Sequence, residues 1–108
     1  MNDCIFCKII TRQIPTTIVA ENDDIIVIND IAPKAPIHCL IIPKKHVQDI
    51  QSFKREDLFF GAKMFEMAQN LAKENNTDFR FIVNSGKMAG QKVFHVHGHF
   101  LAGKEMHD

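Results

Sequence analysis

The chain has 108 residues, 45% of them hydrophobic, which is enough for one domain with one modest core. Its 13 lysines and arginines balance its 13 aspartates and glutamates, which argues against nucleic acid or a charged membrane surface as partner. No apolar run approaches the roughly 18 residues that span a bilayer, and the start, Met1-Asn2-Asp3, lacks the basic and apolar regions of a signal peptide. We therefore expect a single cytoplasmic domain over residues 1–108 that acts on a small molecule.

The N-terminal part of the chain contains one short helix and three strand-like runs. Residues 4–12 have the pattern of a short helix that ends before Pro15. The strand-like runs are Thr16–Ala20, Asp24–Asn29 and His38–Ile42. Two prolines within residues 30–36 predict a turn-rich loop between the second run and the third.

The C-terminal part contains the one long helix, predicted over residues 54–75. Its apolar residues recur at helical spacing and form one broad face, which we interpret as core. These residues are Leu58, Ala62, Phe65, Met67, Ala68, Leu71 and Ala72. Ser52 or Asp49 is a candidate cap near the start of this helix, and Asn75-Asn76 ends it.

Two further strands complete the predicted fold. They span Phe79–Val83 and Val93–Leu101, with a glycine-containing loop over Asn84–Gln91 between them. Antiparallel strands combined with one main helix define an α+β fold.

Three of the six histidines occupy alternate positions in the last predicted strand. The run His95-Val96-His97-Gly98-His99 alternates imidazole with other residues, which is typical of a strand with one half-buried face. Successive strand side chains point to opposite faces, so the three rings are predicted to line one face with neighbours about 6.5–7 Å apart. Core packing gives no reason for this arrangement, so it indicates a chemical role. His38 either joins this cluster or caps a strand, and His107 is expected to be solvated.

An unprotonated imidazole nitrogen can attack phosphorus and form a labile phosphoryl- or nucleotidyl-imidazole that water then hydrolyses. Position favours His97 as the nucleophile because it has an imidazole on each side. His99 is then a candidate for binding the phosphate or assisting proton transfer. In the preceding loop, two glycines allow main-chain N–H groups to face phosphate oxygens, and Asn84 and Gln91 add side-chain donors. Taken alone, this loop has no complete Walker motif, and without the histidines an ordinary connection would be the favoured interpretation.

The pair Cys4-x-x-Cys7 has three interpretations. A thioredoxin-type redox pair needs a preceding strand, which three residues cannot supply. The odd total of three cysteines, without a secretion signal, argues against a disulfide scaffold. A zinc ion needs four ligands, and both His46 and one end of the histidine triplet are available to complete the set. Zinc is the favoured interpretation, and inert cysteines in a packing role are the main alternative.

The triplet and its surroundings resemble the histidine triad (HIT) superfamily. His95-Val96-His97-Gly98-His99-Phe100-Leu101 matches the motif His-φ-His-φ-His-φ-φ, in which φ is an apolar residue. Further segments resemble HIT segments in the expected order, namely 4–10, 30–31, 35–38, 42–46 and 90–95. Within the superfamily the chain looks most like the Hint branch, the small dimeric purine-nucleoside phosphoramidate hydrolases.

The resemblance implies a separate role for each histidine of the triplet. His97 matches the nucleophile that takes the nucleoside 5′-phosphoryl group, and His99 matches the histidine that contacts the phosphate and the bridging oxygen. Zinc-containing members hold the metal at positions that match Cys4, Cys7, His46 and His95. The implied fold is a five-stranded antiparallel sheet with one long and one short helix on one side, paired into a homodimer whose two sheets join.

The resemblance also implies a nucleotide site. Asp30 matches the carboxylate that hydrogen-bonds the ribose hydroxyls, with Ile31 beside it. The walls of the purine pocket match Ile5, Phe6, Ile9 and Ile28. Phosphate-site positions on the loop match Asn84, Gln91 and Val93.

Three features depart from the family pattern. Lys92 stands where the animal Hint proteins carry a serine that assists the leaving group, and its charge is expected to favour anionic leaving groups. Gly98 replaces a bulkier residue inside the triad, and because it faces away from the chemistry we expect it to affect packing. The sequence ends at Met106-His107-Asp108, without the longer tail that shapes specificity in Hint proteins.

These observations predict a nucleotide hydrolase. Its expected reaction releases a nucleoside 5′-monophosphate, AMP above all, from purine nucleoside phosphoramidates through a covalent intermediate on His97. A dinucleoside polyphosphate hydrolase of the same superfamily is the enzymatic alternative. A nucleotide-binding adaptor with little turnover is the alternative from another class, and the intact triplet argues against it because binding alone needs no nucleophile.

Overall fold

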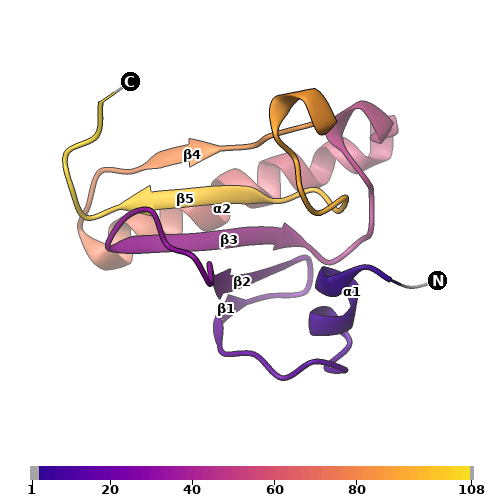
Figure 1. The fold of residues 1–108 in the computed structure, drawn as a ribbon, viewed down its shortest axis with the longest axis horizontal. Helices are drawn as coiled ribbons and strands as arrows, with labels where there is room; N and C mark the ends of the chain where they lie inside the picture. The colour runs from indigo at the N-terminus through magenta and orange to yellow at the C-terminus, as the bar shows by residue number, and fades with distance from the viewer. Residues whose placement is uncertain (1–2, 108) are drawn as a thin grey trace.

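The computed structural model describes residues 3–107, in which five antiparallel strands form one sheet in the order β1-β2-β3-β5-β4 (Figure 1). The strands are β1 Ile18–Glu21, β2 Ile25–Asn29, β3 Ile37–Pro43, β4 Arg80–Ile82 and β5 Gly98–Ala102. The α-helices are α1 Ile5–Ile10 and α2 Leu58–Asn75. The predicted α+β fold, with one long and one short helix, is confirmed. The expectations for Met1-Asn2 and for Asp108 concern residues outside the described range.

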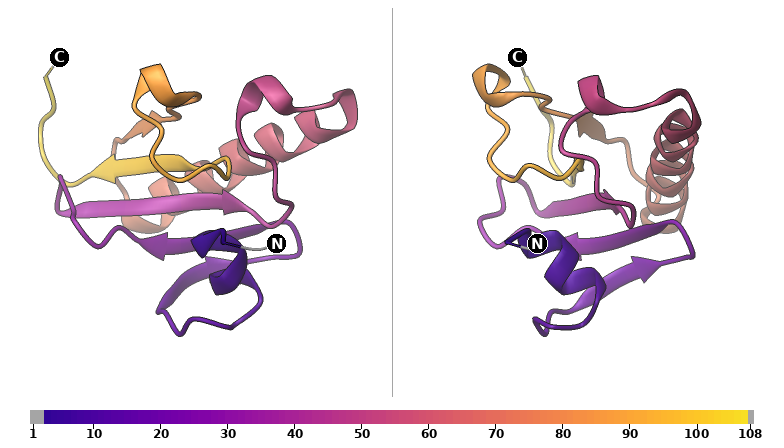
Figure 2. Two further views of the ribbon diagram at one scale, coloured as in Figure 1. Left: turned by 45° about the vertical axis from the view of Figure 1, so that its right-hand side comes forward. Right: turned by 90° about the vertical axis from the view of Figure 1, so that its right-hand side faces the viewer.

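The two α-helices cover opposite faces of the sheet, so the expectation that both lie on one side was wrong (Figure 2). Neighbouring residues in a strand point to opposite faces, and the central strands β2 and β3 bury both. On one face the core joins α2 to alternate strand residues: Ile25, Val27, Cys39, Ile41, Met64, Met67 and Leu71. On the other face it joins α1 to the intervening residues: Phe6, Ile9, Ile26, Ile28, Leu40 and Ile42. The unbroken apolar runs of β2 and β3 are the sequence signal for a sheet covered on both sides.

Helix α2 begins at Leu58 instead of residue 54 because a separate 3₁₀ turn occupies Arg55–Asp57. Asp49 caps another 3₁₀ turn, Ile50–Ser52, where its Oδ1 accepts the main-chain N–H of Ser52 at 2.9 Å. The helix ends as predicted, since Asn76 adopts the left-handed conformation with φ 48°. Neither described α-helix is long and apolar enough to cross a membrane.

The strand predicted over Val93–Leu101 forms only in its second half. β5 begins at Gly98, where it pairs with β3 on one side, while residues 93–97 have no strand partner. The main-chain N–H of Val96 instead donates to the carbonyl of Val47 at 2.8 Å, in the segment that follows β3. The prediction of one continuous strand over 93–101 was therefore wrong, because of the three histidines only His99 lies in the strand.

Candidate active site

Four potential metal ligands from distant parts of the chain converge at the start of α1. Nδ1 of His46 lies 3.1 Å from Nδ1 of His95 and 3.3 Å from Sγ of Cys7. Nδ1 of His95 also lies 3.4 Å from Sγ of Cys4 and 3.6 Å from Sγ of Cys7. A tetrahedral zinc ion, with bonds of about 2.3 Å to sulfur and about 2.0–2.1 Å to nitrogen, needs ligands separated by about 3.3–3.8 Å. Three of the four distances lie in this range and the distance between the two Nδ1 atoms is slightly below it, so the four residues predicted as zinc ligands fit the ion with a small adjustment.

The main chain holds His95 in the form that a metal requires. Its Nε2–H donates to the carbonyl of Pro43 at 2.7 Å, so Nδ1 carries the lone pair that faces the cysteines. Burial lowers the pKa of His95 to about 4, so the ring is neutral at physiological pH. Burial also raises the pKa of Cys7 to about 11. A bound divalent cation opposes this second shift because it stabilises the thiolate.

An ion pair anchors the segment that carries His46. Nζ of Lys45 lies 2.5 Å from Oδ1 of Asp57, a residue buried just before α2. The other carboxylate oxygen accepts the main-chain N–H of Lys54 at 2.9 Å. The hydrogen bond from Lys45 is the main reason why the pKa of Asp57 is lowered, so the carboxylate stays ionised. No sequence pattern pointed to Asp57, because its partner becomes a neighbour only when α2 docks on the sheet.

His97 is held as a neutral imidazole with one free nitrogen. Its Nδ1–H donates to the carbonyl of His95 at 2.8 Å, which leaves the lone pair on Nε2. The residue is 7% exposed, and burial lowers its pKa. The Phe6 ring packs edge-on against it, with ring centroids 5.0 Å apart. A neutral ring with an unprotonated Nε2 is the form in which imidazole is a nucleophile.

His38 joins the imidazole cluster, which decides between the two roles that the sequence left open. It is buried, and its Nε2 lies 2.9 Å from Nδ1 of His99. Its Nδ1 accepts the main-chain N–H of Lys34 at 3.0 Å. Oδ2 of Asp30 lies 3.4 Å from Nε2 of His38 and 3.9 Å from Nδ1 of His99. The ring of His99 in turn lies beside that of His97, with centroids 5.2 Å apart.

The apolar residues predicted for the nucleotide site occupy two different settings. Phe6, Ile9 and Ile28 are buried together between α1 and the sheet, and Val93 packs against them. Ile5 and Ile31 are 46% and 101% exposed and stand free of this core. The structure thus brings the triplet, Asp30 and part of the apolar wall together, and leaves two of the predicted isoleucines at the surface.

Gln91 organises the loop before the triplet. Its Oε1 accepts the main-chain N–H of Gly86 at 2.7 Å. Its amide group donates to the carbonyls of Gln48 and Val93 at 2.7 and 3.0 Å. Both amide hydrogens are therefore used inside the protein, and the geometry gives Gln91 the task of shaping the loop. Asn84, the other predicted amide donor, lies half-buried at the start of this loop.

Lys92 lies beside the predicted metal ligands. It is exposed and lines a groove of about 500 Å³ together with Asp3, Cys4, Ile5, His46, Gln48, Val93 and Phe94. Gly98, by contrast, faces α2 and β4 as predicted. A Cβ atom placed there would come closer than 3.0 Å to the Phe81 ring.

Comparison with known proteins agrees with this geometry. Residues 3–107 match the family described as "Scavenger mRNA decapping enzyme C-term binding". A 14 kDa zinc-binding protein of Brassica juncea is 36% identical over 108 residues, which cover 96% of each chain. The structure of a histidine triad protein from Clostridium difficile is 39% identical, with a TM-score of 0.95 over 100% of this chain and 96% of that chain. That of a HIT family hydrolase from Clostridium thermocellum is 38% identical, with a TM-score of 0.94 over the same shares.

The sheet and its five clustered histidines define a small α+β protein with an imidazole-based centre. The chain belongs to this matched family and, with these relatives, to the histidine triad (HIT) superfamily.

Proposed function

We propose that this protein hydrolyses purine nucleoside phosphoramidates and releases a nucleoside 5′-monophosphate, AMP in particular. The observation that carries the proposal is the hydrogen bond from Nδ1–H of His97 to the carbonyl of His95, which leaves an unprotonated Nε2 at the centre of the cluster. The likeness to a HIT family hydrolase supports hydrolysis as the reaction class.

The reaction proceeds in two displacements at phosphorus. First, the Nε2 lone pair of His97 forms a bond to phosphorus, the P–N bond of the substrate breaks, and the departing amine takes the bonding electrons and a proton from solvent. Water then attacks phosphorus, and the bond between phosphorus and Nε2 breaks. The monophosphate leaves, the proton of the water returns to solvent, and His97 regains its neutral form.

The nucleotide is oriented by two groups of residues. The carboxylate of Asp30 binds the ribose hydroxyls, and the purine lies against the apolar wall around Phe6, Ile9 and Ile28. Lys92 places a positive charge on the neighbouring groove, which also carries the Asp3 carboxylate. Because opposite charges attract across a partly desolvated groove, we expect Lys92 to favour anionic leaving groups.

We further propose that Cys4, Cys7, His46 and His95 hold a structural zinc ion. When bound, the ion neutralises the two thiolates and ties α1 to the segments that follow β3 and precede β5. The zinc-binding relative and the ligand separations of 3.1–3.6 Å support this assignment.

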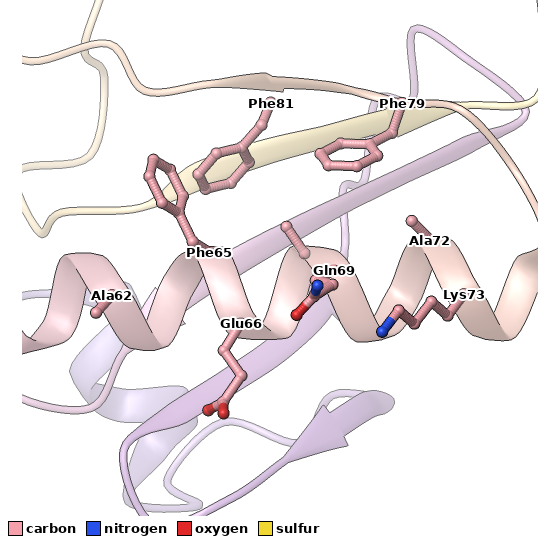
Figure 3. Close-up of a pocket in the computed structure, with 9 residues that line it drawn as sticks. Ala62, Phe65, Glu66, Gln69, Ala72, Lys73, Phe79 and Phe81 are labelled. Atoms are coloured by element: carbon pink, nitrogen blue, oxygen red, sulfur yellow. The ribbon is translucent and has the colours of Figure 1, made fainter.

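We also propose a homodimer that forms across α2 and β4. A groove of about 630 Å³ runs between these elements, with Phe65, Phe79 and Phe81 along it (Figure 3). Phe65 and Phe79 are 69% and 42% exposed, and a contiguous apolar patch of this kind marks an interface. β4 lies at the edge of the sheet, so a second copy can extend the sheet while covering the groove.

A comparison of substrates tests the proposed reaction. Wild-type protein should hydrolyse adenosine 5′-phosphoramidate faster than a diadenosine polyphosphate, and mass spectrometry of the quenched reaction should find AMP attached to His97. The variant His97→Ala should lose both the adduct and turnover while its circular dichroism spectrum is retained. Faster cleavage of the polyphosphate identifies the alternative hydrolase, and tight AMP binding without turnover identifies an adaptor.

A further inference from the structure

A chain of hydrogen bonds leads from the main chain to His99 and fixes the proton of each ring on the way. The main-chain N–H of Lys34 can only donate, so Nδ1 of His38, 3.0 Å away, must accept. The neutral His38 ring therefore carries its proton on Nε2 and donates it to Nδ1 of His99 at 2.9 Å. Since His99 accepts at Nδ1, its own proton is on Nε2.

The same chain opposes protonation of His99. An imidazolium carries N–H groups on both nitrogens, so protonated His99 would set its Nδ1–H against the Nε2–H of His38 across 2.9 Å. Moving the His38 proton to Nδ1 would set it against the N–H of Lys34 instead. Burial, followed by the neighbouring His97 and His38, lowers the pKa of His99 and outweighs the attraction of the Asp30 carboxylate.

These proton positions separate the two clusters of possible metal ligands. The ligand atoms of Asp30, His38 and His99 lie within 4.8 Å of one another, as do those of the predicted zinc site. A metal at the first cluster needs a lone pair on Nε2 of His38, and the Lys34 N–H holds the proton there. His95, in contrast, turns a bare Nδ1 toward the cysteines. The cluster of Asp30, His38 and His99 therefore holds ring protons in fixed positions and does not offer the lone pairs that a metal needs.

We propose that His38 is a positioning residue that keeps His99 neutral with its proton on Nε2. His99 then acts as a hydrogen-bond donor to the phosphoryl group and is not the acid that protonates the leaving group. Among the described residues no protein acceptor occupies Nε2 of His99, so this N–H is free for a ligand. The catalytic part of this inference rests on the proposed hydrolase function, whereas the proton position is a property of the ligand-free protein.

Two matched variants of His38 separate its two hydrogen bonds. His38→Gln places an amide N–H near the position of the Nε2–H and keeps the donor to His99. His38→Asn places a carbonyl oxygen near the position of Nδ1 and keeps only the acceptor for Lys34. Nitrogen-15 NMR distinguishes protonated from bare ring nitrogens in ligand-free protein. Wild type and His38→Gln should show His99 protonated on Nε2 alone, and His38→Asn should show a mixture. Protonation of Nδ1 in wild type, or an unchanged pattern in His38→Asn, overturns the proposal.

Kinetics with two leaving groups test the role of His99. His38→Asn should lower kcat about tenfold, as expected for one weakened hydrogen bond, and by the same factor for an arylamine and an alkylamine phosphoramidate. His38→Gln should recover most of this loss. A larger loss with the alkylamine, the poorer leaving group, would make His99 the acid and overturn the proposal. A wild-type protein with the expected NMR pattern but no hydrolysis overturns the proposed function and supports the proton assignment.

Discussion

The substitution Gly98→Ala tests whether the glycine inside the triad is required by packing. Gly98 is buried in β5, and a Cβ atom there would lie closer than 3.0 Å to Cε1 and Cζ of Phe81 and 3.3 Å from Cε of Met64. The Phe81 ring must therefore move. Overpacking of this kind costs about 1–3 kcal/mol, while alanine in a strand gains about 0.5–1 kcal/mol over glycine. The net expected loss, taken from the midpoints of these ranges, is about 1.3 kcal/mol.

Thermal and urea unfolding measure this loss. At about 2.1 cal/mol/K per residue, the 108 residues give an unfolding entropy of about 0.23 kcal/mol/K. A loss of about 1.3 kcal/mol therefore lowers Tm by about 6 °C. Leucine at position 81 lacks the two ring atoms that clash, so Gly98→Ala should be neutral or slightly stabilising in a Phe81→Leu background.

An equal cost of Gly98→Ala in both backgrounds would show that the Phe81 ring is not the source of the strain. Gly61→Ala is the matched control. No heavy atom lies within 4 Å of a Cβ placed at Gly61 in α2, so this change should stabilise the protein by up to about 1 kcal/mol.

Three further predictions follow from the site and the surface. Protein purified without chelator should contain about one zinc per chain by elemental analysis. The variant Cys7→Ser should lose the zinc, whereas the control Cys39→Ala, at a cysteine away from the cluster, should keep it. Metal-free wild-type protein with reduced cysteines would contradict the assignment. Sedimentation velocity should show that Phe65→Asp converts the dimer into a monomer. The control Met88→Asp, at a residue 104% exposed, should leave the dimer intact. A monomeric wild-type protein refutes the proposed interface. The hydrogen bond from Lys44, with that from Arg12, lowers the pKa of Glu21 below its ordinary 4.5. The stabilisation of the fold by these ion pairs is present above pH 4.5 and is lost as the pH falls through the lowered pKa of Glu21. Glu21→Gln should therefore lower the free energy of unfolding by about 0.5–1 kcal/mol at neutral pH and leave it unchanged in strong acid. An equal loss at neutral and at acid pH argues against the ion pairs.

The sequence by itself determined the features that depend on local spacing. The period of the apolar residues in α2 and the apolar runs of β2 and β3 indicated the main helix and the central strands within a few residues. The triplet at 95–99 and the Cys4-x-x-Cys7 pair identified the residues that gather in the site. Such signals are readable because neighbours in sequence share one element and its period.

Only the tertiary structure decided how those residues are held. The alternation at 95–99 predicted a continuous strand, yet the main-chain N–H of Val96 donates to the carbonyl of Val47 and the strand begins only at Gly98. The proton on His95 is set by the carbonyl of Pro43 and that on His38 by the N–H of Lys34. These partners are main-chain groups, which every residue carries, so no residue type in the sequence reveals them. Which ring nitrogen carries a proton and which keeps a free lone pair therefore follows from how the segments pack.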